Sequence, residues 1–131
     1  MAHLQLVTIV VDDYDIAIAF YVDVLGFDLV EDVPSLTNDG RPKRWVVVRP
    51  RGGEAGILLA EADGPTQARA VGSQTAGRVG FFLRVDDFDS MFGRMRAAGV
   101  RFHGAPRAEP YGTVVVFSDI AGNRWDLLGS S

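Results

Sequence analysis

The stretch Val11-Asp12-Asp13-Tyr14-Asp15 recurs as Val85-Asp86-Asp87-Phe88-Asp89, at an offset of 74 positions. Each copy follows an apolar run and precedes an apolar-periodic stretch that ends at a glycine, Gly26 in the first half and Gly99 in the second. A repeat of this period that occurs only twice is too sparse for a solenoid. It indicates two copies of one module, and paired modules usually build their binding site between them.

The composition bounds the class of protein. The chain has 131 residues, 47% of them hydrophobic and 23% charged, as is usual for a globular domain. It has no cysteine, which excludes disulfides, a thiol nucleophile and a cysteine-based zinc site. A net charge of −4 gives no reason to expect nucleic acid binding. No apolar run reaches the length of a membrane span, and the start lacks a secretory pattern. These features predict a cytoplasmic protein without nucleic acid or membrane partners.

The order of elements predicted from the pattern is βαβββ in both halves. Asp12 or Asp13 begins the first helix as a cap, and Gly26 ends it in a left-handed conformation. The Asp86-Asp87 pair has the same role in the second half, so capping explains both pairs better than catalysis. The predicted strands span residues 4–11, 27–33, 45–49 and 56–61, then 79–85, 100–103, 113–118 and 125–128. We expect one domain with a module at 4–62, a linker at 63–77 that includes a helical turn at 65–71, and a module at 78–129.

Two strings carry a family resemblance. Ala19-Phe20-Tyr21-Val22-Asp23-Val24-Leu25-Gly26-Phe27 and the late turn and strand from Phe117 to Leu127 resemble the vicinal oxygen chelate superfamily. That superfamily includes glyoxalase I, bleomycin-resistance proteins and extradiol dioxygenases. The resemblance implies an α+β fold in which two βαβββ modules form a cupped mixed sheet. It also implies a small-molecule ligand and a homodimer, often with pockets at the subunit interface.

The resemblance further implies four metal-ligand positions, two in each module. They fall on Leu6, on Leu58 or its neighbour Leu59, on Gly80 and on Asp126. Only Asp126 carries a donor, and one carboxylate does not hold a divalent ion. His3, His103 and Glu61 are better explained as surface or strand-end residues. The sequence therefore predicts no metal and no cofactor, and it disfavours a glyoxalase I activity.

Strand alternation nominates residues that face the cup. If Leu6, Gly80 and Asp126 point inward, then Thr8, Phe82 and Arg84 do so too, in a mostly apolar cavity. Trp45 is suited to stacking on a planar ligand, and Tyr111 lies on a loop where its hydroxyl can reach one. Trp125 has the opposite parity to Asp126 and is predicted to be core, as are the helix residues Phe88, Met91, Phe92 and Met95. The predicted ligand-binding residues are Thr8, Trp45, Phe82, Arg84, Tyr111 and Asp126.

Two of these residues keep alternative roles. Arg84 is suited to binding a carboxylate or phosphate, or it pairs with Asp126. Asp126 is a weak candidate for a general base if burial raises its pKa, or it balances Arg84 or Arg124. Three functions follow: a metal-free binding protein of the bleomycin-resistance type, an enzyme (lyase, isomerase or dioxygenase type) without the usual metal, and a metal enzyme with a displaced site.

Overall fold

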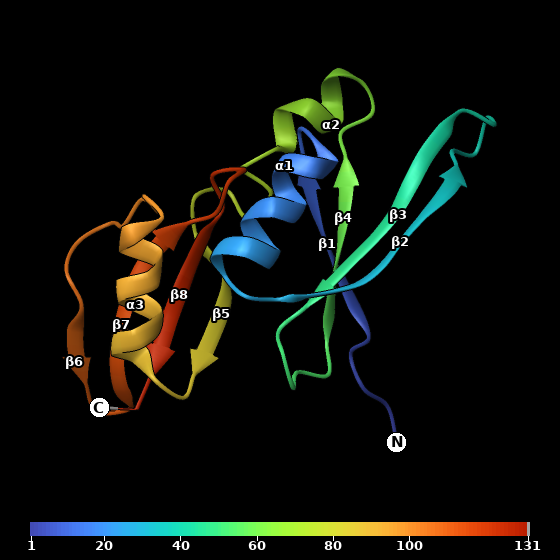
Figure 1. Ribbon diagram of the computed structural model, residues 1–131. Helices are drawn as coiled ribbons and strands as arrows, with labels where there is room; N and C mark the ends of the chain where they lie inside the picture. Colours follow the sequence, from blue (N-terminus) through green and yellow to red (C-terminus); the bar gives the residue numbers. More distant parts are fainter. Residues whose placement is uncertain (131) are drawn as a thin grey trace. The chain divides into compact units, whose positions relative to one another are not determined.

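The computed structural model describes residues 1–130 of the chain (Figure 1). It divides into two compact units, Met1–Val71 and Gly72–Ser131. Each unit has its own four-stranded mixed sheet and its own helix after the first strand. The two βαβββ modules predicted from the repeat are therefore confirmed.

Unit 1 is built on the sheet order β1-β4-β3-β2. The strands are β1 (Leu6–Val11), β2 (Asp28–Leu36), β3 (Pro42–Arg49) and β4 (Gly56–Glu61). β1 runs parallel to β4, and the other two pairs are antiparallel. Ile9, Leu59 and Val46 are fully buried, which places the apolar core on one face of this sheet.

The first helix covers that buried face. α1 (Tyr14–Ile18) continues directly into a π-helical turn, η1 (Ala19–Val24), which the sequence pattern did not predict. The Asp13 carboxylate accepts the Ile16 N–H at 2.9 Å, so the predicted cap is confirmed. Gly26 has a φ of +77° just after the helix, a conformation that favours glycine. A short helix, α2 (Gly64–Ala70), follows β4 at the position of the predicted helical turn.

Unit 2 repeats the arrangement with the sheet order β5-β8-β7-β6. Its elements are β5 (Val79–Val85), α3 (Phe88–Ala97), β6 (Arg107–Glu109), β7 (Gly112–Ser118) and β8 (Arg124–Gly129). Asp87 caps α3 by accepting the Ser90 N–H at 3.0 Å. Phe88 and Met95 of α3 are buried as predicted, whereas Met91 and Phe92 are half-buried.

The predicted strand at residues 100–103 is wrong. Only one bridge forms there, between Phe102 and Phe117, and the outer strand of the sheet is β6. Gly104 turns the chain with a φ of +102°, and Pro106 has no N–H to donate to a ladder. Regular pairing therefore begins only at Arg107, which pairs with Val114 of β7.

The turn from Asp119 to Asn123 is confirmed and is held by one side chain. The buried Asp119 carboxylate accepts the backbone N–H groups of Ala121, Gly122 and Asn123 at 2.9–3.0 Å. It also accepts the Asn123 amide at 3.1 Å and the Trp125 indole N–H at 3.0 Å. Trp125 is 3% exposed, which confirms its predicted place in the core.

None of the helices within residues 1–130 has the length and apolarity that a membrane crossing requires.

Candidate functional site

The two sheets pair their strands in the same way, β1 with β4 and β5 with β8, and these pairings show on which face of its sheet each nominated residue lies. Thr8 pairs with Leu58 on the adjacent strand of unit 1, and Phe82 pairs with Asp126 in the same way in unit 2. These pairs lie on the face of each sheet that no helix of its own unit covers, which we call the open face. Leu59 is fully buried on the other face, so the open position on β4 is Leu58.

The donor set on the open faces does not fit a metal ion. Leu6 and Leu58 carry no donor atom, and Asp126 is the single acid at the four positions that the resemblance nominated. A Cβ added at Gly80 would lie 2.5 Å from the Thr75 side chain, so this position has no room for a ligating residue without a rearrangement. Among residues 1–130, no three His, Cys, Asp or Glu side chains gather in a way that could hold a metal.

Asp126 has an unusual environment on the open face of unit 2. Its Oδ1 atom is enclosed and has no hydrogen-bond partner among the described residues. Burial raises the pKa of the Asp126 carboxyl, and the nearby Arg107 guanidinium partly opposes this. No ion pair joins Asp126 to Arg84 or Arg124 within the described part of the chain. The prediction that Arg84 or Arg124 balances the charge of Asp126 is therefore wrong. The cation whose charge affects the pKa of Asp126 is Arg107 of β6.

Most of the other nominated side chains are open to solvent. Phe82, beside Asp126, is 64% exposed, and Tyr111 at the β6–β7 turn is 55% exposed. Arg84 and Thr8 are exposed as well. These residues form a surface rather than an enclosed cavity in each unit taken by itself.

A pocket that is partly open to solvent does exist in unit 1, where β3 and β4 separate. The two strands pair only from Val48 with Ile57 to Val46 with Leu59. Beyond that point β3 continues with β2 alone, and the two strands diverge in Figure 1. The space between them is a pocket of about 370 Å³, which we call the divergence pocket. It is lined by Tyr14, Thr37, Asn38, Arg41, Pro42, Lys43, Arg44, Trp45, Leu58, Leu59, Ala60, Glu61, Ala62, Asp63 and Gln67.

The divergence pocket is more polar than the cavity that the sequence predicted. Trp45, half-buried, is the one nominated ligand-binding residue in its wall. Leu58, Ala60 and Pro42 add apolar surface, but charged side chains make up much of the remainder. The reason is that the pocket lies at the ends of two strands, where side chains of the adjoining loops also enter.

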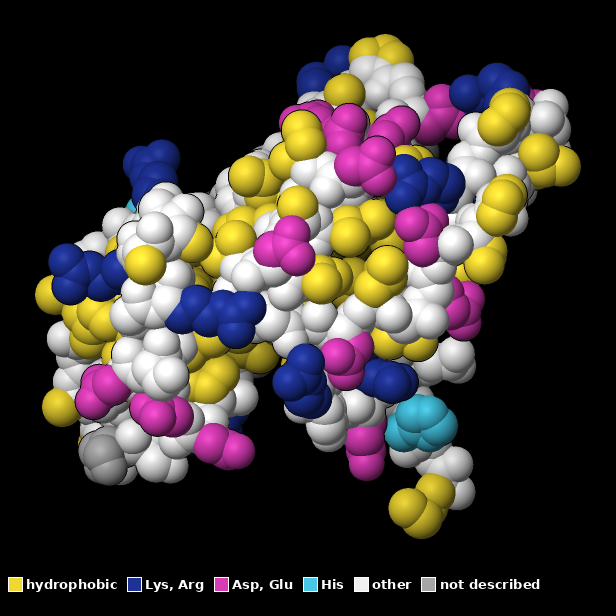
Figure 2. Space-filling view, in the orientation of Figure 1, with side chains coloured by type: hydrophobic (Ala, Val, Ile, Leu, Met, Phe, Trp, Pro, Cys, Tyr) yellow, Lys and Arg dark blue, Asp and Glu magenta, His cyan; other side chains and the backbone are white. Residues whose placement is uncertain are grey.

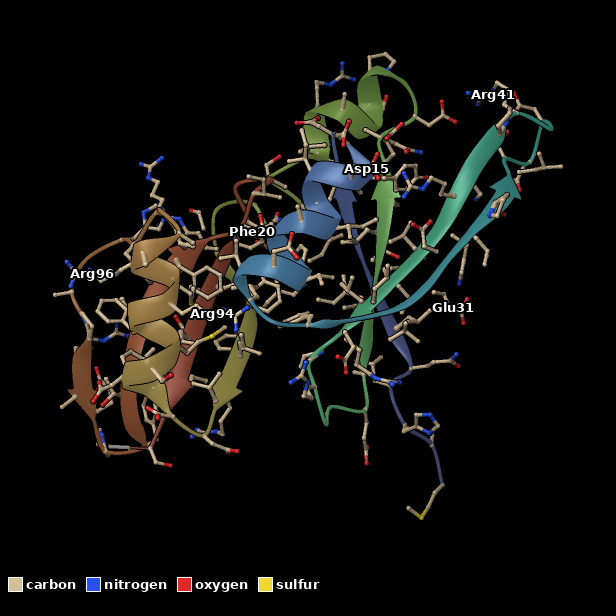
Figure 3. All side chains as sticks on the ribbon, viewed as in Figure 1. Asp15, Phe20, Glu31, Arg41, Arg94 and Arg96 are labelled. Atoms are coloured by element: carbon tan, nitrogen blue, oxygen red, sulfur yellow. The ribbon has the colours of Figure 1, made fainter. Side chains whose placement is uncertain are left out.

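Two arginines of the divergence pocket are each held by two carboxylates. Arg41 binds Asp63 through both terminal nitrogens, at 3.0 and 2.7 Å, and its Nε lies 3.1 Å from Asp39. Arg41 precedes β3, at the tip of the β2–β3 hairpin (Figure 3), and Asp63 precedes α2, so this contact joins two loops that line the pocket. Arg44 binds Asp32 at 2.7 Å and Asp15 at 2.9 Å.

Tyr14 keeps the two strands apart at the inner end. Its hydroxyl accepts the Arg44 backbone N–H at 3.3 Å, a group that would face Glu61 if the ladder continued. The Tyr14 backbone N–H in turn donates to the Glu61 carboxylate at 3.3 Å, and the Arg44 guanidinium lies 5.1 Å from the centre of the Tyr14 ring. The tyrosine hydroxyl thus takes the place of a strand partner for β3, and the Tyr14 backbone holds the Glu61 side chain of β4.

His103 is half-buried in unit 2 and has a partner that the sequence did not reveal. Its Nε2 lies 2.6 Å from the Ser118 hydroxyl. Burial, with Arg124 and Arg101 nearby, lowers the pKa of His103. No carboxylate hydrogen-bonds to its ring within residues 1–130, so the pair lacks the third group of a catalytic triad. We interpret it as a contact that fixes the 99–106 segment against β7.

Known proteins resemble this chain in both sequence and fold. Residues 2–127 match the model of the Glyoxalase/Bleomycin resistance protein/Dioxygenase superfamily. An uncharacterized protein of Shewanella frigidimarina (strain NCIMB 400) is 48% identical over 123 residues, which cover 93% of this chain and 89% of that protein. The crystal structure of TnmS3, described as an antibiotic binding protein from Streptomyces sp. CB03234, superposes with a TM-score of 0.79 at 34% identity, covering 100% and 98% of the two chains. A glyoxalase/bleomycin resistance protein from the same strain gives a TM-score of 0.75 at 33% identity, with 96% and 99% covered.

Proposed function

The chain belongs to the Glyoxalase/Bleomycin resistance protein/Dioxygenase superfamily, and from that premise we propose that it is a metal-free protein that binds a small organic molecule. The superfamily contains both enzymes and binding proteins, so membership alone does not decide between them. The decision rests on the residues of the site.

The observation that carries the proposal is the divergence pocket with Trp45 in its wall. Its volume of about 370 Å³ lies within the range of roughly 300–1,000 Å³ that small-molecule sites occupy. An indole face beside aliphatic side chains provides a stacking surface for a planar ring, and polar groups at the rim orient it. The similarity to TnmS3, an antibiotic binding protein, supports the proposal that this chain also binds a small organic molecule.

The proposed function uses no metal ion, and the residues at the expected metal-ligand positions support this. Three of the four expected ligand positions hold leucine or glycine, and Thr75 fills the space over Gly80. We also propose a homodimer in the cytosol. Support for the dimer comes from β2, an end strand of its sheet with Val33 and Leu36 exposed at 48% and 61%. Sedimentation as a monomer at micromolar concentration would contradict the dimer.

A thermal-shift screen tests the binding function. The full chain is heated with a panel of planar aromatic compounds of different charge, and the expected result is a higher Tm with at least one of them. The same compound should fail to stabilise Trp45→Ala. If no planar compound raises the Tm of the wild-type protein, the proposed function is wrong.

A second function, metal-free catalysis at Asp126, is favoured by one observation. Its carboxyl combines an unpartnered, enclosed oxygen with a raised pKa, which are properties of a general acid or base. This function predicts turnover that survives chelator treatment and falls sharply in Asp126→Asn. Turnover unchanged by that substitution would remove Asp126 from the mechanism.

A further inference from the structure

We infer that the divergence pocket takes a planar organic cation that carries an N–H donor. This inference rests on the proposed binding function and specifies the chemical class of the ligand. Three independent features of unit 1 lead to it: the interrupted strand pairing, the balance of charge around the pocket, and the aromatic wall.

The interrupted pairing marks the pocket as a place for an occupant. No strand pairing joins Arg44 and Trp45 of β3 to Glu61 and Ala60 of β4, although both segments are in strands. These four residues are half-buried or exposed, so the backbone polar groups of this edge are open to water or to a bound molecule. At this edge the Arg44 N–H finds its partner in the Tyr14 hydroxyl. A flat molecule with hydrogen-bonding groups on its rim is suited to the remaining space.

The charge around the divergence pocket is negative. Arg41 and Arg44 are each shared between two carboxylates, and Glu61 adds a fifth. The lining itself carries three cations, Arg41, Arg44 and Lys43, and two of the acids, Glu61 and Asp63, so its net charge is +1. The other three carboxylates, Asp15, Asp32 and Asp39, lie outside the lining and pair with the two arginines, which brings the whole cluster to −2. In Figure 2 acidic side chains, with Lys and Arg side chains among them, gather over the end of unit 1 that carries α1 and the tip of the β2–β3 hairpin. A surplus of carboxylates attracts a cation and repels an anion.

The position of Glu61 makes the preference specific. Its carboxylate accepts one backbone N–H, from Tyr14 at 3.3 Å, and pairs with no cation within the described residues. It therefore keeps acceptor capacity for an N–H group of a ligand. Trp45 adds the electron-rich face that stabilises a flat cation. Lys43 lines the pocket without an ion pair among the described residues. Its positive charge weakens the attraction of the pocket for a cation, so removing that charge should strengthen cation binding.

The test uses three tricyclic probes of similar shape: 9-aminoacridine, which is a cation at neutral pH, neutral acridone, and anthracene-9-carboxylate. Their affinities for the full chain are measured by calorimetry at low salt. We expect 9-aminoacridine to bind about tenfold or more tightly than the carboxylate, and salt to weaken its binding. Glu61→Gln should weaken its binding by about fivefold, because glutamine keeps the Tyr14 contact but loses the charge. Lys43→Gln should tighten it by about threefold.

Glu54→Gln is the matched control, since Glu54 lies in the turn between β3 and β4, outside the pocket lining. It changes net charge as Glu61→Gln does and should leave the affinity unchanged. Equal losses in the two variants would show attraction to the whole acidic surface and overturn the inference. Equal or tighter binding of the anion or of acridone, lost in Trp45→Ala, would also overturn it but leave the proposed function intact. If none of the three probes binds, the inference is wrong, and the proposed function is wrong as well only if the wider thermal-shift panel also gives no stabilisation.

Discussion

Replacing Asp119 by alanine tests how unit 2 holds the strand that carries Asp126. The Asp119 carboxylate accepts five hydrogen bonds, and two of the donors, the Asn123 amide and the Trp125 indole N–H, belong to residues that are 2% and 3% exposed. Without the carboxylate those two donors stay buried and unpaired, at a cost of about 1–3 kcal/mol each. The backbone N–H groups of Ala121 and Gly122 are only part-buried, so they can turn to water and cost less. We expect a loss of about 3–4 kcal/mol from the free energy of unfolding.

The assay is urea denaturation followed by circular dichroism, with the m-value checked for constancy. Asp89→Ala is the control, because it removes an exposed carboxylate from the first turn of α3 in the same unit. Its cost should stay within about 0.5 kcal/mol. A loss below about 1 kcal/mol in Asp119→Ala, with an unchanged m-value, would refute the role assigned to this carboxylate.

Three further predictions concern stability. Because the folded pKa of Asp126 is raised above 3.8, its ionised form destabilises the fold at pH 7, and this deficit vanishes as the pH falls through the raised pKa and below 3.8. Asp126→Asn should therefore be more stable than wild type in urea unfolding at pH 7, with the gain shrinking at acid pH, and a pH-independent difference would contradict this. Asp13→Ala and Asp87→Ala should each cost about 1 kcal/mol by calorimetric or urea unfolding, and costs near zero would exclude capping. Gly93→Ala places a Cβ with no atom within 4 Å, so it should raise the free energy of unfolding by about 0.5–1 kcal/mol through the helix propensity of α3. Gly129→Ala places a Cβ 2.6 Å from Phe88 Cβ, so it should lower the free energy of unfolding by about 1–3 kcal/mol. The reverse order of the two variants in urea unfolding would contradict the packing.

The elements near the repeated phrase were predictable because their signals are local. Asp13 and Asp87 mark helix starts by their chemistry, and Gly26 and Gly99 mark the ends. Parity along β8 correctly placed Trp125 in the core and Asp126 on the opposite face. These inferences needed only residue type and strand period.

The features that the sequence did not reveal depend on contacts between distant segments. Gly104 and Pro106 shift the last antiparallel pairing from residues 100–103 to β6, which brings Arg107 into the field of Asp126. The divergence pocket exists because β3 stops pairing with β4 at Val46, and no periodicity records where a ladder ends. The ion pair between Arg41 and Asp63 joins two loop residues that are 22 positions apart, and the spacing of loop residues in the sequence does not predict which of them meet.

The most direct test of ligand binding is a crystal structure of the protein grown with 9-aminoacridine at a saturating concentration. The account predicts difference density for a flat tricyclic molecule between β3 and β4, stacked on Trp45 and with its amino group at the Glu61 carboxylate. Density on another surface, or an empty divergence pocket at a concentration that saturates binding in solution, would contradict it.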